Sequence, residues 1–317
     1  MNQPQRPGPP GVNADQPAEI PAAGWWQVTK RAWAEAKSDQ VPLIAAGVAF
    51  FGFLSLFPAV VAAVLAYGLI ADPAQIRTQT QDLAAAMPAS ARDLLLGQID
   101  ALTSAPRQGL GLGLAVAVLV ALWSASGGTG YLITAVNLAY DEDETRGFVR
   151  RKVLALSLTL GAIIFLLLAI GLFAVGAAIT DGVPTVVRVL LEIARLAVAL
   201  ILITVALAVI YRVAPARDAP RLRWVSVGAA VGTIIWLIAS IGFSFYVATF
   251  GSYAKTYGSL AAVVILMLWL WLTVYAILLG AEINAESEEQ TARDTTRGEP
   301  RPLGERGAVK ADSLPQQ

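Results

Sequence analysis

Long uncharged runs alternate with short charged stretches along this chain, a pattern typical of membrane-spanning helices. The last run, Ser259 to Ala281, has 23 residues without a charge. As an α-helix it would extend for about 34 Å, which is enough to cross a bilayer core. Trp269 and Trp271 lie near its middle, away from the interfacial positions that tryptophan prefers in lipid-facing helices. We therefore expect this helix to pack against protein.

Five further runs could each span a membrane, so the pattern predicts six transmembrane helices. The composition agrees, since 56% of the residues are hydrophobic and 15% are charged, against about 45–50% and about 25% in soluble proteins. The expected fold class is an all-α polytopic membrane protein. The five runs are Leu43–Ile70, Gly109–Tyr140, Val153–Thr180, Val189–Tyr211 and Trp224–Thr249.

The first two spans contain residues that can interrupt a helix. Pro58 removes a backbone hydrogen bond in the first span, so we expect a kink there, either as tolerated curvature or as a hinge lining a cavity. Ser55, one turn earlier, could bond a freed carbonyl. In the second span, the stretch Trp123 to Gly130 reads WSASGGTG and predicts a broken or kinked backbone, followed by a helical piece ending at Tyr140. Such a break needs cover from protein or water.

Two later spans carry residue pairs with a structural meaning. Glu192 and Arg195 are three positions apart on one face of the fourth span and are expected to form an ion pair. Gly228 and Gly232 are four positions apart in the fifth span, a spacing that permits close helix contact.

The N-terminal part of the chain divides into two polar segments before the first span. Residues 1–23 are rich in proline and have no periodicity, which predicts disorder. Residues 24–37 place Trp25, Trp26 and Trp33 on one side of a helix and charged residues on the other. This is typical of an amphipathic helix in the headgroup layer, which would anchor the first span or sense lipids.

Two other polar segments complete the expected domain organisation. Residues 72–108 contain two helix N-cap signals and predict an external helical hairpin. Residues 286–317 are polar and are expected to form a disordered cytoplasmic tail. Residues 24–285 then form the six-span membrane domain.

The distribution of basic residues predicts how the chain is oriented. On one side, the N-terminal region, the second and fourth loops and the tail hold 17 Lys and Arg residues, against five on the other side. Under the positive-inside rule, both termini are therefore cytoplasmic. The first 23 residues contain no apolar signal-peptide core, so the first span is expected to direct insertion.

The residue types that the chain lacks limit the reactions and metal sites that it can support. The chain has no cysteine and no histidine, so it lacks thiolate chemistry, disulfides and the usual zinc ligands. Its 23 basic and 23 acidic residues balance, which argues against nucleic-acid binding. A nuclease would need metal-binding carboxylates or a histidine in a wet site. We expect no enzyme activity, no cofactor and no metal site.

Three stretches together resemble the YihY/virulence-factor BrkB family of bacterial inner-membrane proteins. They are AAGVAFFGFLSLFP at Ala45–Pro58, the stretch from Trp123 to Lys152 that begins WSASGGTGYLITAVNLAYDEDETRG, and the stretch from Phe250 to Glu286 that begins FGSYAKTYGSL. The resemblance implies a multi-pass inner-membrane protein with six helices, and it assigns no reaction. Members of the family were formerly labelled ribonuclease BN.

The resemblance also selects polar positions as candidates for a functional or structural role. Arg146 is expected to anchor the loop after the second span through Tyr140, Asn137 or the adjacent acidic residues. The candidates, all at positions that match the family pattern, are Ser55, Pro58, Ser126, Asn137, Tyr140, Arg146, Tyr253, Tyr257, Glu282 and Asn284.

Glu282 and Asn284 are the most informative of these positions, because they directly follow the last uncharged run. Two residues apart on a helix, their side chains point about 200° apart. We expect Glu282 to face the bundle and Asn284 the headgroups. Glu282 would then have Ser126 or Asn137 as its partner, unless it only marks the membrane interface.

Two classes of function remain open at this point. A transporter, or a protein that handles lipids or envelope components, is favoured by the proline in the first span and the expected break in the second. Its partners would be membrane lipids and a lipid or small-molecule substrate. The alternative is a structural or assembly factor of the cell envelope, and a ribonuclease is the least favoured.

Overall fold

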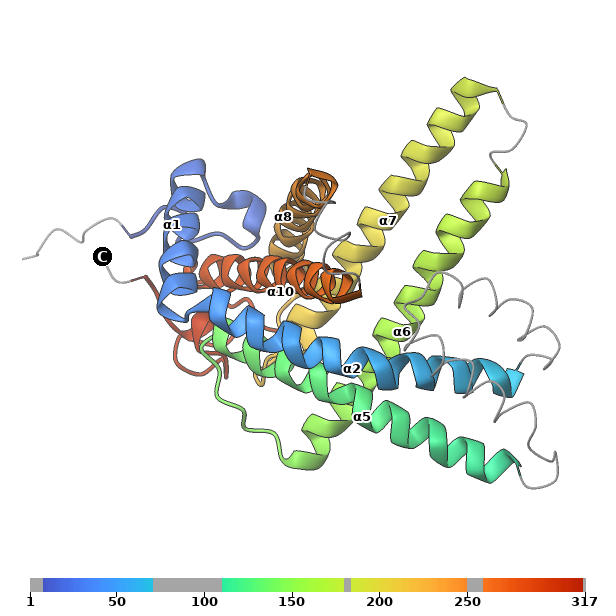
Figure 1. Ribbon diagram of the computed structural model, residues 1–317. Coiled ribbons are helices and arrows are strands. Elements are labelled where there is room, and N and C mark those ends of the chain that lie inside the picture. Colours follow the sequence, from blue (N-terminus) through green and yellow to red (C-terminus); the bar gives the residue numbers. More distant parts are fainter. Residues whose placement is uncertain (1–7, 71–109, 180–183, 250–258, 316–317) are drawn as a thin grey trace, which may run out of the picture.

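The computed structural model describes residues 8–70, 110–179, 184–249 and 259–315 (Figure 1). Its described part is helical, apart from loops, turns and an isolated β-bridge between Pro220 and Thr296. Six helices are long and apolar enough to cross a membrane, which confirms the predicted all-α, six-span fold. The elements are η1 (Pro17–Glu19), α1 (Ala22–Ser38), α2 (Val41–Ile70), α5 (Leu110–Ala139), α6 (Phe148–Ile179), α7 (Thr185–Val213), α8 (Leu222–Thr249), α10 (Ser259–Glu289) and η2 (Lys310–Asp312).

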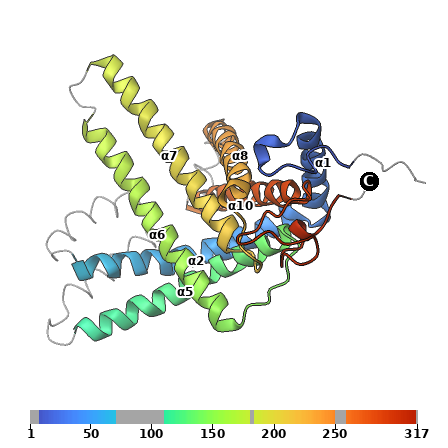
Figure 2. The ribbon, with the colours of Figure 1, turned by 180° about the vertical axis from the view of Figure 1, so that it is seen from behind.

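The six spans are arranged so that each helix packs on the next, in the order α5, α2, α10, α8, α7 and α6, and α6 packs on α5. In both ribbon views, α2 and α5 lie side by side, whereas α6 and α7 run together in another direction (Figures 1 and 2). The expected external hairpin at 72–108 lies outside the described residues.

Single polar contacts cross the seams between neighbouring spans. In lipid, hydrogen bonds between helices add to van der Waals packing, because the apolar surroundings supply little force for association. The contacts are Ser55 with Gly128 at 2.9 Å, Thr129 with Thr159 at 2.8 Å, Thr204 with Thr233 at 3.1 Å, Trp236 with Thr273 at 3.1 Å, and Trp271 with the carbonyl of Pro42 at 2.9 Å.

Helices α8 and α10 cross closely at glycines, which confirms the small-residue spacing of Gly228 and Gly232. A Cβ on Gly228 would overlap the carbonyl oxygen of Gly280, so the two backbones touch directly. Tyr211 of α7 reaches into the same crossing, where its hydroxyl donates a 2.7 Å hydrogen bond to the carbonyl of Ile277. Three helices are thereby joined at one point.

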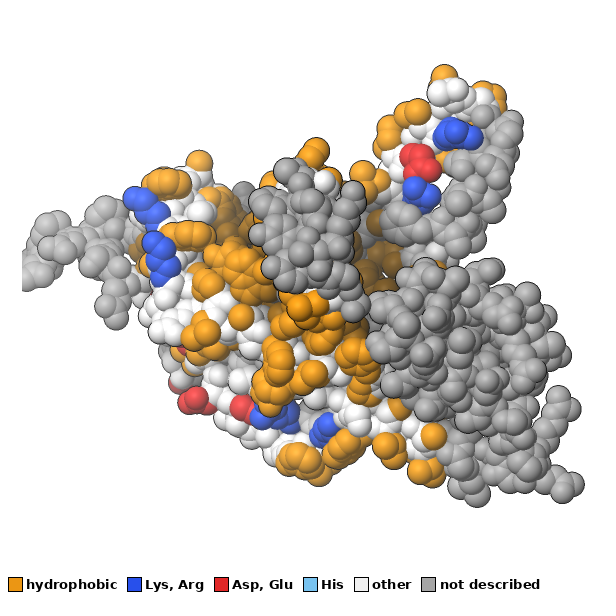
Figure 3. Space-filling view, viewed as in Figure 1, with side chains coloured by type: hydrophobic (Ala, Val, Ile, Leu, Met, Phe, Trp, Pro, Cys, Tyr) orange, Lys and Arg blue, Asp and Glu red, His pale blue; other side chains and the backbone are white. Residues whose placement is uncertain are grey.

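Part of the α6–α7 pair stands clear of the other spans. Leu166, Leu167 and Leu168 are consecutive in α6 and are 56%, 57% and 56% exposed, so this stretch is exposed around most of its circumference. In α7, Val186 and Leu190 are likewise exposed. Figure 3 shows hydrophobic side chains along α7, with both basic and acidic side chains among them. The predicted ion pair of Glu192 with Arg195 in this helix is confirmed.

Helix α1 divides its apolar side between protein and surroundings. Small residues spaced four apart face the molecule, namely Gly24, Val28, Ala32 and Ala36, and α1 packs there on α10. Trp26 and Trp33 are exposed instead, and each has a lysine ammonium above its ring, from Lys30 at 5.1 Å and from Lys37 at 5.5 Å. The amphipathic helix expected at residues 24–37 is therefore present, with Trp26 and Trp33 facing outward and Trp25 half-buried against Trp224.

The expected break after Trp123 is wrong, because α5 runs as one helix from Leu110 to Ala139. Serine and glycine serve packing here. The Ser126 hydroxyl donates back to the carbonyl of Trp123 at 2.7 Å, within the helix. A Cβ on Gly128 would lie 2.8 Å from Ser55 Oγ and 3.0 Å from Gly52 Cα, so the glycine lets α2 approach α5.

The expectation of disordered ends also differs from the structure. Helix α10 continues to Glu289, and the segment 290–315 that follows is packed on the rest of the molecule. At the N-terminus, the described residues 8–21 contain η1 and turns. The two ends pair directly, since the amide of Ala292 donates to the carbonyl of Val12 at 2.8 Å and Thr291 Oγ1 donates to Ala14 at 2.7 Å.

Candidate functional site

Most of the candidate residues that the structure describes lie at one end of the bundle. This end, called here the terminal end, contains α1, the loop 140–147 between α5 and α6, the loop 214–221 between α7 and α8, the end of α10 and the segment 290–315. It is the left part of the molecule in Figure 1. Both described ends of the chain therefore lie on the same side of the spans.

A buried ion pair forms the centre of the terminal end. The guanidinium of Arg217, from the loop after α7, binds both carboxylate oxygens of Glu288 in α10, at 2.6 and 3.1 Å. Thr295 Oγ1 donates to the same carboxylate at 2.6 Å. Because both side chains are fully buried, the pair depends on these mutual contacts for its stability.

Tyr140 lies directly against this pair. Its ring centroid is 4.5 Å from the guanidinium carbon of Arg217, an arrangement that suits a cation–π contact. Its hydroxyl is buried without a hydrogen-bond partner among the described residues. Burial raises the pKa of Tyr140 above its ordinary value, against the opposing effect of Arg217. The ring therefore acts as a neutral, packed surface for the arginine.

Arg146 and Asn137 tie the loop after α5 to the loop after α7. The Arg146 guanidinium holds Glu144 with bonds of 2.7 and 2.8 Å and donates to the carbonyl of Ala214 at 2.7 Å. Asn137 donates to Glu144 at 3.1 Å and accepts the amide of Ala216 at 2.7 Å. The hydrogen bonds from Arg146 lower the pKa of Glu144, against the effect of burial. Arg146 thus contacts an adjacent acidic residue and neighbouring backbone.

Asn284 is buried, which corrects the expectation that it faces the headgroups. Its oxygen accepts the amide of Gly228 at 2.7 Å, and its nitrogen donates to the carbonyl of Val225 at 3.1 Å. Glu282, about 200° away on α10, is buried as well. Both side chains can be buried because α8 covers one side of α10 and α1 covers another.

Glu282 does not have the partner that the sequence suggested. Ser126 bonds within its own helix, and Asn137 bonds Glu144 and Ala216. One carboxylate oxygen of Glu282 is buried without a hydrogen-bond partner in the described chain. A buried polar atom without a partner is rare in folded proteins and requires an explanation beyond stability.

Glu286 connects α10 to both ends of the chain. Arg31 of α1 donates to it at 2.5 Å, and the ammonium of Lys310 donates to its other oxygen at 2.8 Å. Lys310 also contacts Asp141 at 2.9 Å. Although burial alone would lower the pKa of Lys310, these carboxylates raise it, so the ammonium remains charged.

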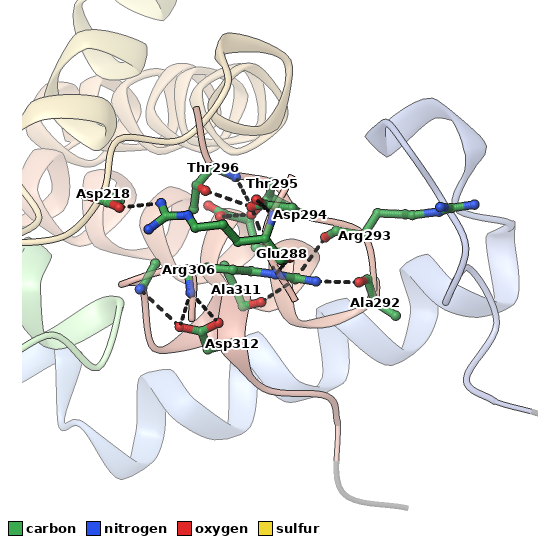
Figure 4. A network of polar contacts seen from close by, with 12 residues as sticks. Asp218, Glu288, Ala292, Arg293, Asp294, Thr295, Thr296, Arg306, Ala311 and Asp312 are labelled. Carbon is green, nitrogen blue, oxygen red and sulfur yellow. Dashed lines mark hydrogen bonds and ion pairs between the residues drawn. The ribbon is translucent and has the colours of Figure 1, made fainter. Parts of the chain in front are cut away.

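The segment 290–315 is held by side chains that bind backbone groups (Figure 4). Arg306 donates to the carbonyls of Ala292, Arg293 and Ala311 at 2.5, 3.0 and 2.6 Å. Asp312 accepts the amide of Arg306 at 3.0 Å. The segment is thereby held in a folded arrangement against the rest of the terminal end.

The remaining candidates lie elsewhere. Ser55 joins α2 to α5 through Gly128, and Pro58 lies within α2, which runs as one helix to Ile70. Tyr253 and Tyr257 lie outside the described residues. In the described part of the chain, no group of three or more carboxylates is placed to hold a metal ion.

Sequence reasoning missed Arg31, Arg217, Glu286, Glu288 and Lys310. It assigned the charged residues after Ala285 to a disordered tail, although the sequence there carries a signal for a continued helix. No glycine or proline occurs from Ala281 to Arg297, and residues 285–289 read AESEE, which favours continuation of the helix.

The fold and the terminal end define a polytopic helical membrane protein whose spans are joined at one end by buried charge pairs. Residues 32–303 match the family described as virulence factor BrkB, and the chain belongs to that family. The resemblance seen in the sequence is therefore confirmed.

Relatives of known name agree with this placement. YfkH of Bacillus subtilis, whose name calls it ribonuclease-like, is 34% identical over 250 residues, which are 76% of this chain and 87% of YfkH. UPF0761 membrane proteins of Tolumonas auensis and Vibrio parahaemolyticus are 39% identical over 79 residues and 45% identical over 65 residues. Those matches cover 26% and 21% of the relatives' lengths, and 24% and 20% of this chain. No solved structure matches.

Proposed function

We propose that this protein handles lipids or similar amphipathic envelope components in the bacterial inner membrane, moving them between the two leaflets. The observation that carries the proposal is the position of the α6–α7 pair. These helices diverge from α2 and α5, and their apolar side chains are exposed, as at Leu167 and Leu190 (Figures 1 and 2). The exposed apolar side chains of α6 and α7 suit acyl chains, so a substrate with such chains would contact these helices directly from the membrane.

In this proposal, the contacts at the terminal end hold the helices together at that end and so stabilise a closed state of the bundle. The buried pair of Arg217 with Glu288 and the contacts of Arg146 join three separate segments there. Helices that are fixed at one end and diverge at the other can open by tilting about the fixed end, a common form of motion in transport proteins.

Glu282 is the residue we expect to take part in such a cycle. Among the described residues, one buried carboxylate oxygen of Glu282 has no hydrogen-bond partner, which is energetically unfavourable. A second conformation that supplies a partner would be stabilised by that contact. Glu282→Gln keeps the shape of the side chain and removes its charge. We expect this variant to keep its membrane abundance and to lose activity.

A lipid-translocation assay tests the proposal. The purified protein is reconstituted into liposomes that carry a fluorescent phospholipid, and dithionite quenching reports the probe that reaches the outer leaflet. Wild-type protein should increase the rate of quenching over empty liposomes. Glu282→Gln should slow it, whereas Glu305→Gln, a change at an exposed glutamate, should not. Equal rates in protein-containing and empty liposomes would contradict the proposal.

The alternative is a structural or assembly factor of the envelope. The exposed apolar side chains of α6 and α7 would then contact helices of a partner protein. In that case, crosslinking from positions such as Leu167 in membranes should capture one partner protein, and the liposomes should show no translocation.

We also propose that the terminal end is cytoplasmic. The four segments that hold 17 of the basic residues contribute to this end, as the positive-inside rule requires. A reporter fused to the C-terminus that is active only in the cytoplasm should be active, and one that is active only in the periplasm should be inactive. The opposite result would reverse the orientation.

A further inference from the structure

A pocket of about 350 Å³ opens where α1 meets the start of α2 and the middle of α10. Its lining includes Trp33 and Lys37 of α1, Gln40 between α1 and α2, Leu43 at the start of α2, and Tyr275 of α10. Its position joins the amphipathic helix to the beginning of the first span. We therefore expect one side of the pocket to lie in the headgroup layer and the other in the acyl-chain region.

The aromatic wall of the pocket is held in place by a ring contact and a hydrogen bond. The ring of Tyr275 stacks on Trp271, with centroids 5.8 Å apart and planes at 6°. The indole nitrogen of Trp271 donates to the carbonyl of Pro42 at 2.9 Å, which ties this wall to the start of α2. A fixed aromatic wall can bind a ligand with little loss of side-chain entropy.

The pocket carries one cation at its rim. The Lys37 ammonium lies 5.5 Å from the ring centroid of Trp33. It forms no ion pair with a carboxylate within the described ranges, unlike Arg31 and Lys310 at the terminal end. Lys37 is exposed, and its charge is available to an anion at the pocket mouth.

The backbone at the pocket is strained. Gln40 has a φ of +53°, in the left-handed region that residues other than glycine rarely adopt. Its side chain carries an amide and contributes to the lining. Strain of this kind is retained when the surrounding structure requires it, and it is frequent at ligand sites.

We propose that this pocket binds a glycerophospholipid, with the phosphate at Lys37 and Gln40 and the glycerol and first acyl carbons between Trp33, Leu43 and Tyr275. The charge of Lys37 complements the phosphate, and the apolar wall complements the chains. Beyond the pocket, Leu43 and Phe50 are exposed along α2, so the acyl chains have an apolar surface to follow. The inference deepens the proposed function, on which it rests for the class of ligand.

Native mass spectrometry of the full chain in detergent tests the proposal, with dioleoyl phosphatidylglycerol as the probe. Lys37→Glu should weaken binding by about tenfold, from loss and reversal of one interfacial charge. Lys30→Glu is the matched control, because Lys30 lies on the same helix, also contacts a tryptophan and does not line the pocket. It should weaken binding by less than about twofold.

Two further measurements distinguish the contribution of the Lys37 charge to binding from that of the apolar wall. Dioleoylglycerol, which lacks the phosphate, should bind weakly and equally to wild type and Lys37→Glu. Trp33→Ala should weaken binding of both lipids, because it removes an apolar wall. Equal loss with Lys30→Glu and Lys37→Glu, or tight binding of dioleoylglycerol, would overturn the proposal, since the charge of α1 or the chains alone would then explain binding.

The lipid-binding experiment and the translocation assay test separate claims, so either proposal can fail without the other. If lipids do not cross between leaflets but Lys37→Glu selectively loses phosphatidylglycerol, the pocket is a lipid site and the proposed translocation is wrong. If translocation occurs and Lys37→Glu binds the lipid as wild type does, the pocket proposal alone is wrong.

Discussion

The side chain of Asn284 joins α10 to α8, since it accepts the amide of Gly228 at 2.7 Å and donates to the carbonyl of Val225 at 3.1 Å. An amide is the group that matches this pair, because one of its ends accepts and the other donates. Because α8 and α10 approach closely at Gly228 and Gly280, the Asn284 side chain has little room to adopt another position.

Replacing Asn284 should therefore lower stability. Asn284→Asp keeps the size of the side chain but places an oxygen against the Val225 carbonyl. We expect a loss of about 1–2 kcal/mol in the free energy of unfolding, measured by thermal or denaturant unfolding in detergent. Ser226→Ala is the control, because the Ser226 hydroxyl donates to the carbonyl of Arg223 in its own helix. A similar loss in both variants would contradict the role of Asn284.

Arg217 and Glu288 should show strong coupling. Removing one partner leaves the other charge buried, so Arg217→Met and Glu288→Gln should each cost about 3 kcal/mol in the free energy of unfolding. The double variant should lose much less than the sum of the two. A double-mutant cycle by denaturant unfolding measures this coupling, and additive losses would show that the pair does not act as a unit.

Gly128→Ala should separate α2 from α5, because the added carbon would lie 2.8 Å from Ser55 Oγ. We expect a loss of about 1–3 kcal/mol, in the range of overpacked cores. Gly130→Ala offers a matched control two residues away, since a Cβ there meets no atom of another described element within 4 Å. That control should be neutral or slightly stabilising, because alanine favours a helix. Unfolding in detergent compares the two, and equal stability would contradict the packing role.

Asp39 should make stability depend on pH. Burial and the carboxylates of Asp141 and Glu35 raise the pKa of Asp39 to about 6 from 3.8, against the effect of Lys310. The folded state then binds the proton more tightly than the unfolded state. The contribution of Asp39 is therefore most favourable below about pH 4 and is lost as the pH rises to about 6.

Asp39→Asn should remove this dependence. At pH 7 we expect the variant to be more stable than wild type by about 1 kcal/mol, allowing for the partly exposed position of Asp39. The difference should vanish near pH 4, measured as unfolding curves over a series of pH values. The exposed Asp143→Asn serves as control. A stability difference that grows toward low pH would have the wrong sign for this explanation.

Much of the terminal end could not be predicted from sequence, because its contacts join distant segments. Arg31 and Glu286 are separated by 255 positions, and Arg217 and Glu288 by 71. No periodicity relates such residues, and each looked like an ordinary charge beside a span. The matches to the family pattern identified Asn137, Tyr140, Arg146, Glu282 and Asn284, which all lie at this end, but not the charges that surround them.

The corrections share one physical cause. Serine and glycine at Trp123–Gly130 predicted a break in α5, yet the same small residues allow close approach to α2 within a continuous helix. The polar residues after Ala285 predicted disorder. In the structure, segments from both ends of the chain and two loops supply their hydrogen-bond and ion-pair partners. In each case, the local sequence is compatible with two states, and the neighbouring element selects one.

The sequence by itself determined the six spans, their all-α class and the family, because crossing a bilayer requires long uncharged helices whose length and apolarity are local properties. It also determined the ion pair of Glu192 with Arg195 and the small-residue crossing at Gly228. Only the tertiary structure decided which polar groups are buried and paired, and that one carboxylate oxygen of Glu282 is buried without a hydrogen-bond partner among the described residues. Burial and pairing depend on how separate helices pack, a property that no single stretch of sequence contains.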